Sequence, residues 1–163
     1  MRTAGFAPET GLLILRGVLG ITFITHGWPK LMDGASGTAE FFGMLGIPMP
    51  GAAAWLITLL EVFGGLALVL GLLVPVFSTL LILHMLVAIF LVHLPEGWFV
   101  VGPGTGGAEF SVLLIAGLLT LILTGPGRPA LDFKLAGRAG ETEAPAAGGP
   151  AVPPEGTGPA QGA

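Results

Sequence analysis

The chain has 163 residues, of which 53% are hydrophobic and only 10% are charged. Soluble domains usually carry about 25% charged residues, so this composition excludes an ordinary soluble globule and indicates a membrane protein. The chain has no cysteine, which excludes disulfides, thiol redox chemistry and thiolate-bound metal clusters within it, and its net charge of -4, without a basic patch, does not indicate a nucleic-acid partner.

Four apolar runs predict membrane-spanning helices, since each approaches the ~17–25 residues that a helix needs to cross a bilayer. The runs are residues 11–26, 52–73, 75–94 and 109–125. They do not alternate apolar and polar residues as the strands of a barrel would. Arg16 within the first run, and the absence of a small-residue cleavage site after it, favour a retained helix over a signal peptide. The predicted fold class is an all-α integral membrane protein, a four-transmembrane-helix antiparallel bundle.

The basic residues and the tryptophans predict the orientation of this bundle. The basic residues that flank the first and last runs are Arg2, Arg128, Lys134 and Arg138. Because the loops at the opposite end hold only Lys30, the positive-inside rule places both termini in the cytoplasm. The expected location is the inner (plasma) membrane. Trp28, Trp55 and Trp98 fall at the outer ends of their helices, as an interfacial belt would.

The segments between and after the runs complete the predicted organisation. Residues 38–51 (TAEFFGMLGIPMPG) predict a short helix in the first outer loop, which either lies on the membrane surface or folds back as a lid. The glycine-rich loop 95–107 lacks the strand and helix that flank a nucleotide-binding loop. Residues 1–10 are predicted as a cytoplasmic N-terminus, 11–132 as the membrane domain and 133–163 as a disordered cytoplasmic tail.

Ionisable side chains inside the spans are the candidate functional residues, because each costs about 2–3 kcal/mol or more near the membrane centre unless it has a partner or a wet cavity. At a rise of about 1.5 Å per residue, Glu61 and His84 lie near the centre. Arg16 lies nearer the cytoplasmic end. The residues predicted at the outer ends are His26, Lys30, His93 and Glu109.

Glu61 has two possible surroundings. Gly64 and Gly65 share its helix face and would let a neighbouring helix approach closely. Arg16 is the permanent cation inside the bundle, so an Arg16–Glu61 ion pair is the simplest structural interpretation. Alternatively, Glu61 faces His26 or His93 and belongs to a polar pocket that opens outward.

The histidines extend this choice. His84 and His93 are nine residues apart, about 900° of helical rotation, which predicts opposite faces and separate sites. His93 then joins the outer cluster, and His84 is interpreted as a core histidine bonded to a carbonyl. Two imidazoles and carboxylates could hold zinc or iron, but no pair has the i, i+3 or i+4 spacing of a strong motif, so no metal is predicted. A quinone head group needs the same donors and acceptors between apolar walls.

The order and spacing of these motifs resemble the DoxX family of small bacterial four-helix membrane proteins over about residues 11–132. The matching stretches are LLILRGVLGITFITHGWPKL (12–31), TAEFFGMLGIPMP (38–50), LLEVFGGLALVLGLL (59–73), MLVAIFLVHLPEGWF (85–99), GGAEFSVLLIAGLL (106–119) and GPGRPALD (125–132). The residues that fall within its recurring motifs are Arg16, His26, Lys30, Glu61, Gly64, Gly65, His93, Glu109 and Asp132.

The resemblance implies a link to quinone chemistry. The family is named for a subunit of an archaeal terminal quinol oxidase and is similar to the membrane subunit of thiosulfate:quinone oxidoreductase, and other members are associated with oxidant-defence complexes in mycobacteria. The resemblance assigns no catalytic role to any single residue.

The function expected from the residues and the resemblance is a membrane subunit that supports electron transfer between a partner oxidoreductase and the quinone pool. His26 and His93 would hydrogen-bond the quinone oxygens. Glu61 and Glu109 would accept or relay protons, and Lys30 would stabilise negative charge. Two alternatives stay open: a small-molecule or proton-coupled carrier, and a non-catalytic assembly module in which Arg16 and Glu61 only pin helix packing.

Overall fold

The computed structural model describes residues 8–94 and 107–132, which are helical with short connections and contain no strand. The elements are α1 (Pro8–Met32), α2 (Ser36–Met44), α3 (Pro50–Leu70), α4 (Val74–Ala88), the π-helical segment η1 (Ile89–His93) and α6 (Ala108–Thr124). The predicted all-α fold class of a helical membrane bundle is confirmed. The predictions for the N-terminal residues 1–7, for Trp98 and most of its loop, and for the tail from 133 lie outside the described residues.

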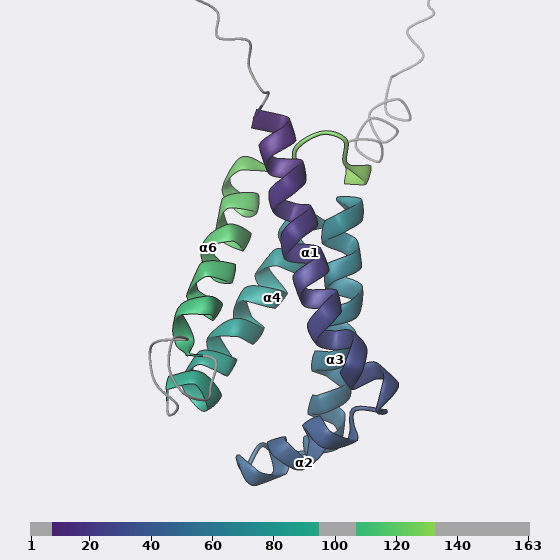
Figure 1. Ribbon diagram of the computed structural model, residues 1–163, viewed down its shortest axis with the longest axis vertical. Coiled ribbons are helices and arrows are strands. Elements are labelled where there is room, and N and C mark those ends of the chain that lie inside the picture. Colours follow the sequence, from purple (N-terminus) through teal and green to yellow (C-terminus); the bar gives the residue numbers. More distant parts are fainter. Residues whose placement is uncertain (1–7, 95–106, 133–163) are drawn as a thin grey trace, which may run out of the picture.

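The long helices form two closely packed pairs. The most extensive contacts join α1 to α3 and α4 to α6. In Figure 1, α2 lies across the lower end of the bundle, whereas the start of α1 and the segment after α6 lie together at the upper end. The predicted short helix in the first loop is therefore present, while its position at a membrane surface stays a prediction.

Within the described residues, three helices are long and apolar enough to cross a membrane: α1, α3 and the continuous helix that α4 and η1 form (Val74–His93). The helix α6 is apolar but shorter, with 17 residues, so the count of four spans stays a prediction. The predicted bounds of the last three runs differ from the helices by only a few residues. The predicted end of the first helix, at residue 26, is wrong, because α1 continues past His26 to Met32.

The sequence ITHGWPK fails to stop α1 because Gly27 is a packing residue. A Cβ added at Gly27 would lie 2.8 Å from the Cβ of Glu61 and 3.1 Å from the backbone nitrogen of Val62, so only glycine lets α1 approach α3 here. Pro29 lies inside the helix, where its missing amide removes one helical hydrogen bond. The next residue, Lys30, bonds to Glu61, which fixes the last turns of α1 against α3.

The same helices touch again two turns away, at Gly20 and Gly65. A Cβ on Gly20 would lie 2.5 Å from the carbonyl oxygen of Gly65, and a Cβ on Gly65 would lie 2.6 Å from the carbonyl oxygen of Gly20. Small residues of this kind let membrane helices pack backbone to backbone. Gly65 was singled out from the sequence for this reason, and the structure confirms the close approach.

Adding one methyl group at this contact should destabilise the protein. We expect Gly20→Ala to lower the free energy of unfolding by about 1–3 kcal/mol, the usual cost of overpacking. The matched control is Gly17→Ala on the same helix, where an added Cβ meets nothing within 4 Å and helix propensity favours alanine by about 1 kcal/mol. Thermal unfolding in detergent measures both variants. Equal midpoints for the two would contradict the close contact.

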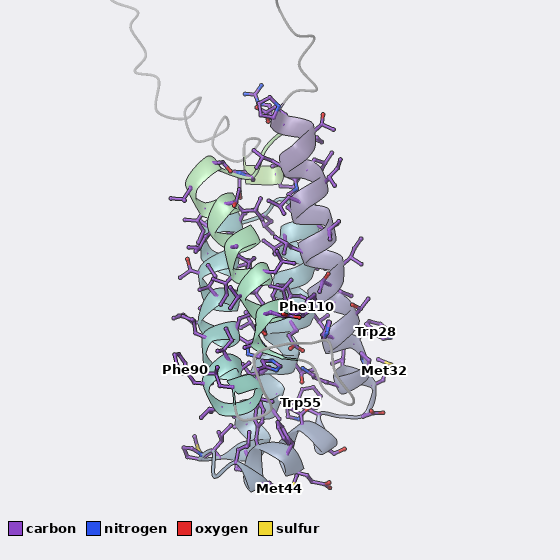
Figure 2. The ribbon with its side chains drawn as sticks, turned by 60° about the vertical axis from the view of Figure 1, so that its left-hand side comes forward. Trp28, Met32, Met44, Trp55, Phe90 and Phe110 are labelled. Atoms are coloured by element: carbon purple, nitrogen blue, oxygen red, sulfur yellow. The ribbon has the colours of Figure 1, made fainter. Side chains whose placement is uncertain are left out.

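An apolar core fills the space between the two helix pairs. Its buried members are Leu19, Phe23, Leu68, Val74, Leu81, Met85, Leu114, Leu118 and Leu121. The outward faces are apolar as well: Phe90 is 66% exposed and Leu123 is 83% exposed. Figure 2 shows Trp28 and Phe90 pointing away from the bundle. Apolar side chains on both the inner and outer faces are typical of a protein whose surroundings are lipid.

The segment after α6 closes the upper end of the bundle over Arg16, which is 2% exposed. Its Nη1 donates to the carbonyl oxygens of Pro126 at 2.8 Å and Gly127 at 3.2 Å, and its Nη2 donates to the carbonyl oxygen of Pro129. A Cβ on Gly71 would lie 2.7 Å from Nη1, so glycine leaves room for the guanidinium there. Arg16 therefore holds the chain after α6 against α1.

Asp132 fastens the same segment to the start of α4. Its Oδ1 accepts from the amide of Leu73 at 2.6 Å and its Oδ2 accepts from the amide of Val74 at 3.1 Å, while its own amide donates to the carbonyl of Gly71 at 3.0 Å. Leu73 is the N-cap residue of α4 and Val74 is its first residue, so neither amide has a helical acceptor. A carboxylate from a distant part of the chain thus caps this helix.

Removal of this cap should weaken the fold at the α3–α4 turn. We expect Asp132→Ala to lower the free energy of unfolding by about 1–2 kcal/mol, as for other N-cap losses. The control is Asp33→Ala, because Asp33 is exposed and its hydrogen bonds with Pro29 and Ser36 are made by its backbone. Denaturation in increasing SDS measures both. A variant Asp132→Ala as stable as Asp33→Ala would show that the cap contributes nothing.

Candidate functional site

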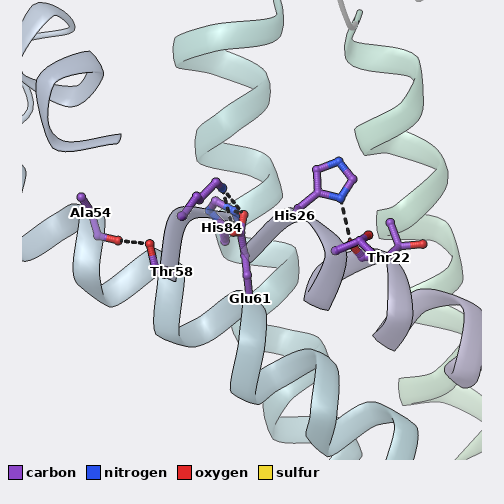
Figure 3. Close-up of polar contacts among 8 residues, drawn as sticks. Thr22, His26, Ala54, Thr58, Glu61 and His84 are labelled. Atoms are coloured by element: carbon purple, nitrogen blue, oxygen red, sulfur yellow. Dashed lines mark hydrogen bonds and ion pairs between the residues drawn. The ribbon is translucent and has the colours of Figure 1, made fainter. Parts of the chain in front are cut away.

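A buried ion-pair cluster joins three helices at Glu61. The Glu61 residue is 3% exposed and lies on α3. Lys30 Nζ on α1 donates to both of its carboxylate oxygens at 2.7 Å, and His84 Nε2 on α4 lies 3.1 Å from Oε1. Figure 3 shows Glu61 and His84 meeting between the helices. We call Lys30, Glu61 and His84 the charged triad.

The predicted Arg16–Glu61 ion pair is wrong. Arg16 uses its guanidinium donors on the carbonyl oxygens after α6, whereas Glu61 is paired with Lys30. Lys30 lies about 21 Å further along α1 than Arg16 at 1.5 Å per residue, and it reaches Glu61 because the helix continues through Gly27. A first helix that ended at His26 would not include Lys30, so the sequence did not predict Lys30 as the partner of Glu61.

His84 also has a different partner from the one predicted. It contacts the carboxylate of Glu61, so the interpretation as a core histidine bonded to a carbonyl is wrong. The sequence held a signal for this contact, because the helical rise placed His84 and Glu61 at the same depth. The loop between α3 and α4 is short, which makes the two helices antiparallel neighbours and brings equal depths together.

The triad forms part of the wall of a cavity of about 380 Å³. The cavity is lined by α1, α2, α3, α4 with η1, and α6, and most of the lining side chains are apolar. The polar and titratable residues that line it are Thr22, His26, Lys30, Thr38, Glu61, His84, His93 and Ser111. The structure thus brings four of the predicted site residues, His26, Lys30, Glu61 and His93, to one cavity. Glu109 is not among the lining residues; its neighbours Phe110 and Ser111 are.

The prediction that His84 and His93 cannot share a site is also wrong, since both line this cavity. The reason is the π-helical segment η1, which ends at His93. One π turn adds a residue relative to an α-helix and turns the following side chains back by about 100°. Hydropathy does not reveal such a turn, so the rotation computed for a regular helix placed His93 on the wrong face.

His26 is held at this cavity by two contacts. Its Nδ1 lies 2.8 Å from the carbonyl oxygen of Thr22. A carbonyl only accepts, so Nδ1 carries the proton and Nε2 of the neutral ring is an acceptor. The ring stacks on Phe110 of α6, with centroids 6.3 Å apart and planes at 30°. The orientation of the imidazole is therefore set by α1 and α6 together.

The cavity presents both a hydrogen-bond donor and a hydrogen-bond acceptor to a ligand. The Lys30 ammonium has three N–H donors and uses two on Glu61, which leaves a third for a ligand oxygen. The Lys30 side chain is 30% exposed, so part of it is accessible from outside the bundle. Nε2 of His26 can accept a hydroxyl proton. A polar, planar molecule with two oxygens can therefore be bound by a donor and an acceptor between apolar walls.

The described residues give no arrangement for a metal: within 8–94 and 107–132, no three His, Asp or Glu side chains are grouped so that they could hold an ion. Of the ligand set considered from the sequence, His26, Glu61 and His93 line the cavity, but they are not grouped closely enough to hold an ion, and Glu109 does not line it. Glu61 has its oxygens on Lys30 and His84 instead.

Comparison with known proteins relates the sequence of this chain to a family of membrane proteins. The DoxX family model matches residues 11–94. The relative named "Putative oxidoreductase CatD" of Bacillus subtilis (strain 168) is 37% identical over 124 residues, which cover 76% of this chain and 86% of the relative. "Inner membrane protein YphA" of Escherichia coli (strain K12) is 33% identical over 132 residues, which cover 78% and 92%. "Inner membrane protein YqjF" of the same organism is 32% identical over 124 residues, which cover 76% and 91%. No solved structure matches the chain.

Proposed function

This chain belongs to the DoxX family of membrane proteins, and from that premise and the charged triad we propose that it is the membrane subunit of a quinone-linked oxidoreductase. Its role is to bind a quinone head group in the cavity and to deliver protons while a partner protein supplies electrons. The word oxidoreductase in the name of the Bacillus relative supports a redox role. The observation that carries the proposal is a buried carboxylate, bonded by a lysine and a histidine, at the wall of a largely apolar cavity.

The cavity suits a quinone head group by size and by chemistry. Its volume of about 380 Å³ lies in the usual range for small-molecule sites, roughly 300–1,000 Å³. One quinone oxygen accepts a hydrogen bond from the third N–H of Lys30. The opposite oxygen lies towards His26, whose Nε2 accepts the proton of the corresponding quinol hydroxyl. The apolar walls, Phe23 and Leu114 among them, contact the ring faces.

Reduction of a quinone to a quinol needs two electrons and two protons. The electrons come from a two-electron donor on the partner, such as a reduced flavin, because this chain has no cysteine to supply a thiol couple. Each quinone oxygen gains one proton: the oxygen at Lys30 receives it through Lys30 and the Glu61–His84 pair, and the opposite oxygen receives it from Nε2 of His26 after that ring has taken up a proton from water. Water reaches the exposed part of Lys30 and restores these protons. Glu61 keeps the ammonium in place and carries the compensating negative charge.

A carrier function is less well supported by the packing. Transport across the bilayer would need a polar path from Glu61 to the end where Arg16 lies. The cavity floor, formed by Phe23, Met85 and Leu114, belongs to the apolar core that continues towards that end. An assembly module resting on an Arg16–Glu61 pair loses its basis, because these residues have other partners.

The proposed placement follows from the same features. Both termini are cytoplasmic, α6 is the fourth span, and the cavity lies in the outer half of the inner membrane. Trp28 and Trp55 lie in the half of the bundle nearer α2 (Figure 2), where the outer interface is proposed. A cysteine introduced at exposed Gly37 on α2 should react with an impermeant maleimide added to intact cells, and reaction only after lysis would reverse the orientation.

The proposal is tested by isolating the full chain from native membranes in mild detergent. We expect about one extractable quinone per chain and a co-purifying oxidoreductase that reduces added quinone only when this chain is present. A preparation that retains no quinone, and binds none when a benzoquinone is titrated into it, would overturn the proposed function.

A further inference from the structure

A second cavity, of about 180 Å³, lies beside the first, between α2, α3 and the continuous helix of α4 and η1. Its lining residues are Phe42, Leu45, Ile47, Ala53, Leu56, Ile57, His84, Val87, Ala88, Leu91 and Val92. Apart from His84, every one of these side chains is apolar. The second cavity therefore offers a polar ligand almost no hydrogen-bonding partner. The binding of a quinone head group described above does not account for this cavity.

The two cavities share a wall. The residues that line both are Phe42, Ile57, His84, Ala88 and Val92. His84 is the hydrogen-bonding member of this wall: it contacts Glu61 within the charged triad. The two cavities are thus adjacent at His84, and a ligand whose polar part lies against the triad needs to pass only this wall, not the core of the bundle, to reach an apolar space.

The second cavity also borders the lipid-facing surface. Several of its lining side chains are among the exposed apolar residues of the protein: Leu56 is 67% exposed and Val87 is 55% exposed. They come from α3 and from α4, the two helices that flank the cavity. A chain that enters from the acyl region of a bilayer would pass between these residues.

We propose that the second cavity holds the apolar tail of a membrane quinone whose head group lies in the first cavity. This inference rests on the proposed function and narrows it: the substrate is a tailed, lipid-soluble quinone that enters sideways from the bilayer, rather than a small water-soluble quinone. Adjacency across the shared wall, an apolar lining and access from lipid together match an unbranched or isoprenoid hydrocarbon attached to a polar ring.

The test compares two probes with the same benzoquinone ring, one carrying a decyl tail and one carrying none, titrated into the full chain in lipid nanodiscs. We expect the tailed quinone to bind at least tenfold more tightly. Ala53→Phe fills the second cavity, which Ala53 lines and the first cavity does not include, and should remove that advantage while leaving the tail-less probe unchanged. Ala52→Phe is the matched control, because Ala52 is exposed on the same helix and lines neither cavity.

The outcomes separate this inference from the function on which it rests. Binding of neither probe by the unaltered chain would overturn the proposed function itself. Equal binding of both probes, or an equal loss of both in Ala53→Phe, would overturn the tail site and leave the head-group site standing. The tailed probe partitions into the lipid equally in Ala53→Phe and in the control Ala52→Phe. Only a loss of tailed-probe binding that is confined to Ala53→Phe therefore supports the inference. Val87→Phe, on the opposite wall, gives the same test if Ala53→Phe does not fold.

Discussion

Glu61→Gln should reduce quinone-linked turnover by about 100-fold or more, within the range that general acid–base groups contribute, while the protein stays folded. Glutamine has nearly the same shape as glutamate and still offers an oxygen to Lys30 and His84. It cannot carry a negative charge or accept a proton from them. The loss should therefore appear in the rate of quinol formation, measured with the partner oxidoreductase and a saturating quinone.

The control for this variant is Glu40→Gln on α2, an exposed glutamate outside both cavities. It makes the same chemical change and should leave turnover unaltered. An increase of KM at constant turnover in Glu61→Gln would mean that Glu61 serves only ring binding, by holding Lys30 in place, and takes no part in proton transfer. Full activity in Glu61→Gln, with the same detergent stability, would remove Glu61 from the mechanism altogether.

Much of the fold could be predicted because hydropathy records which segments face lipid. The last three helices follow the apolar runs closely, and Gly65 indicated a close approach of helices that the structure contains. The end of α1 could not be predicted in the same way. Gly27 and Pro29 are stop signals in a helix taken alone, and they are tolerated here only because α3 packs against Gly27 and Glu61 bonds to Lys30.

The candidate site was predictable in most of its members and not in its pairing: His84 was missed, and Glu109 does not line the cavity. Depth along each helix placed His26, Lys30 and His93 together at one end, and all three line the cavity with Glu61. The partner of Glu61 depended on helix length and on rotation, which hydropathy does not report. The π turn of η1 changed the face of His93, and the partners of Arg16 are backbone carbonyls, which no side-chain pattern announces.

The separate contributions of the triad to stability and to chemistry can be resolved by Lys30→Met, alone and together with Glu61→Gln. Lys30→Met leaves a buried carboxylate without its cation, and breaking a buried pair in this way costs about 3–5 kcal/mol. Because the Lys30 side chain is 30% exposed, we expect the lower end of that range, seen as a large shift of the unfolding midpoint in SDS. Methionine keeps most of the apolar stem of lysine, so the loss of packing should be small.

Adding Glu61→Gln to Lys30→Met removes the unpaired charge and leaves a neutral amide beside His84. Replacing both members of a buried ion pair by neutral groups is often close to neutral for stability, so the double variant should recover most of the loss. Its quinone turnover should remain as low as in Glu61→Gln, because it has neither the donor nor the carboxylate. Stability regained without activity would show that the triad is retained for its chemistry. If turnover returned together with stability, Lys30 and Glu61 would act only in packing α1 against α3, and the proton route would have to use other residues of the cavity.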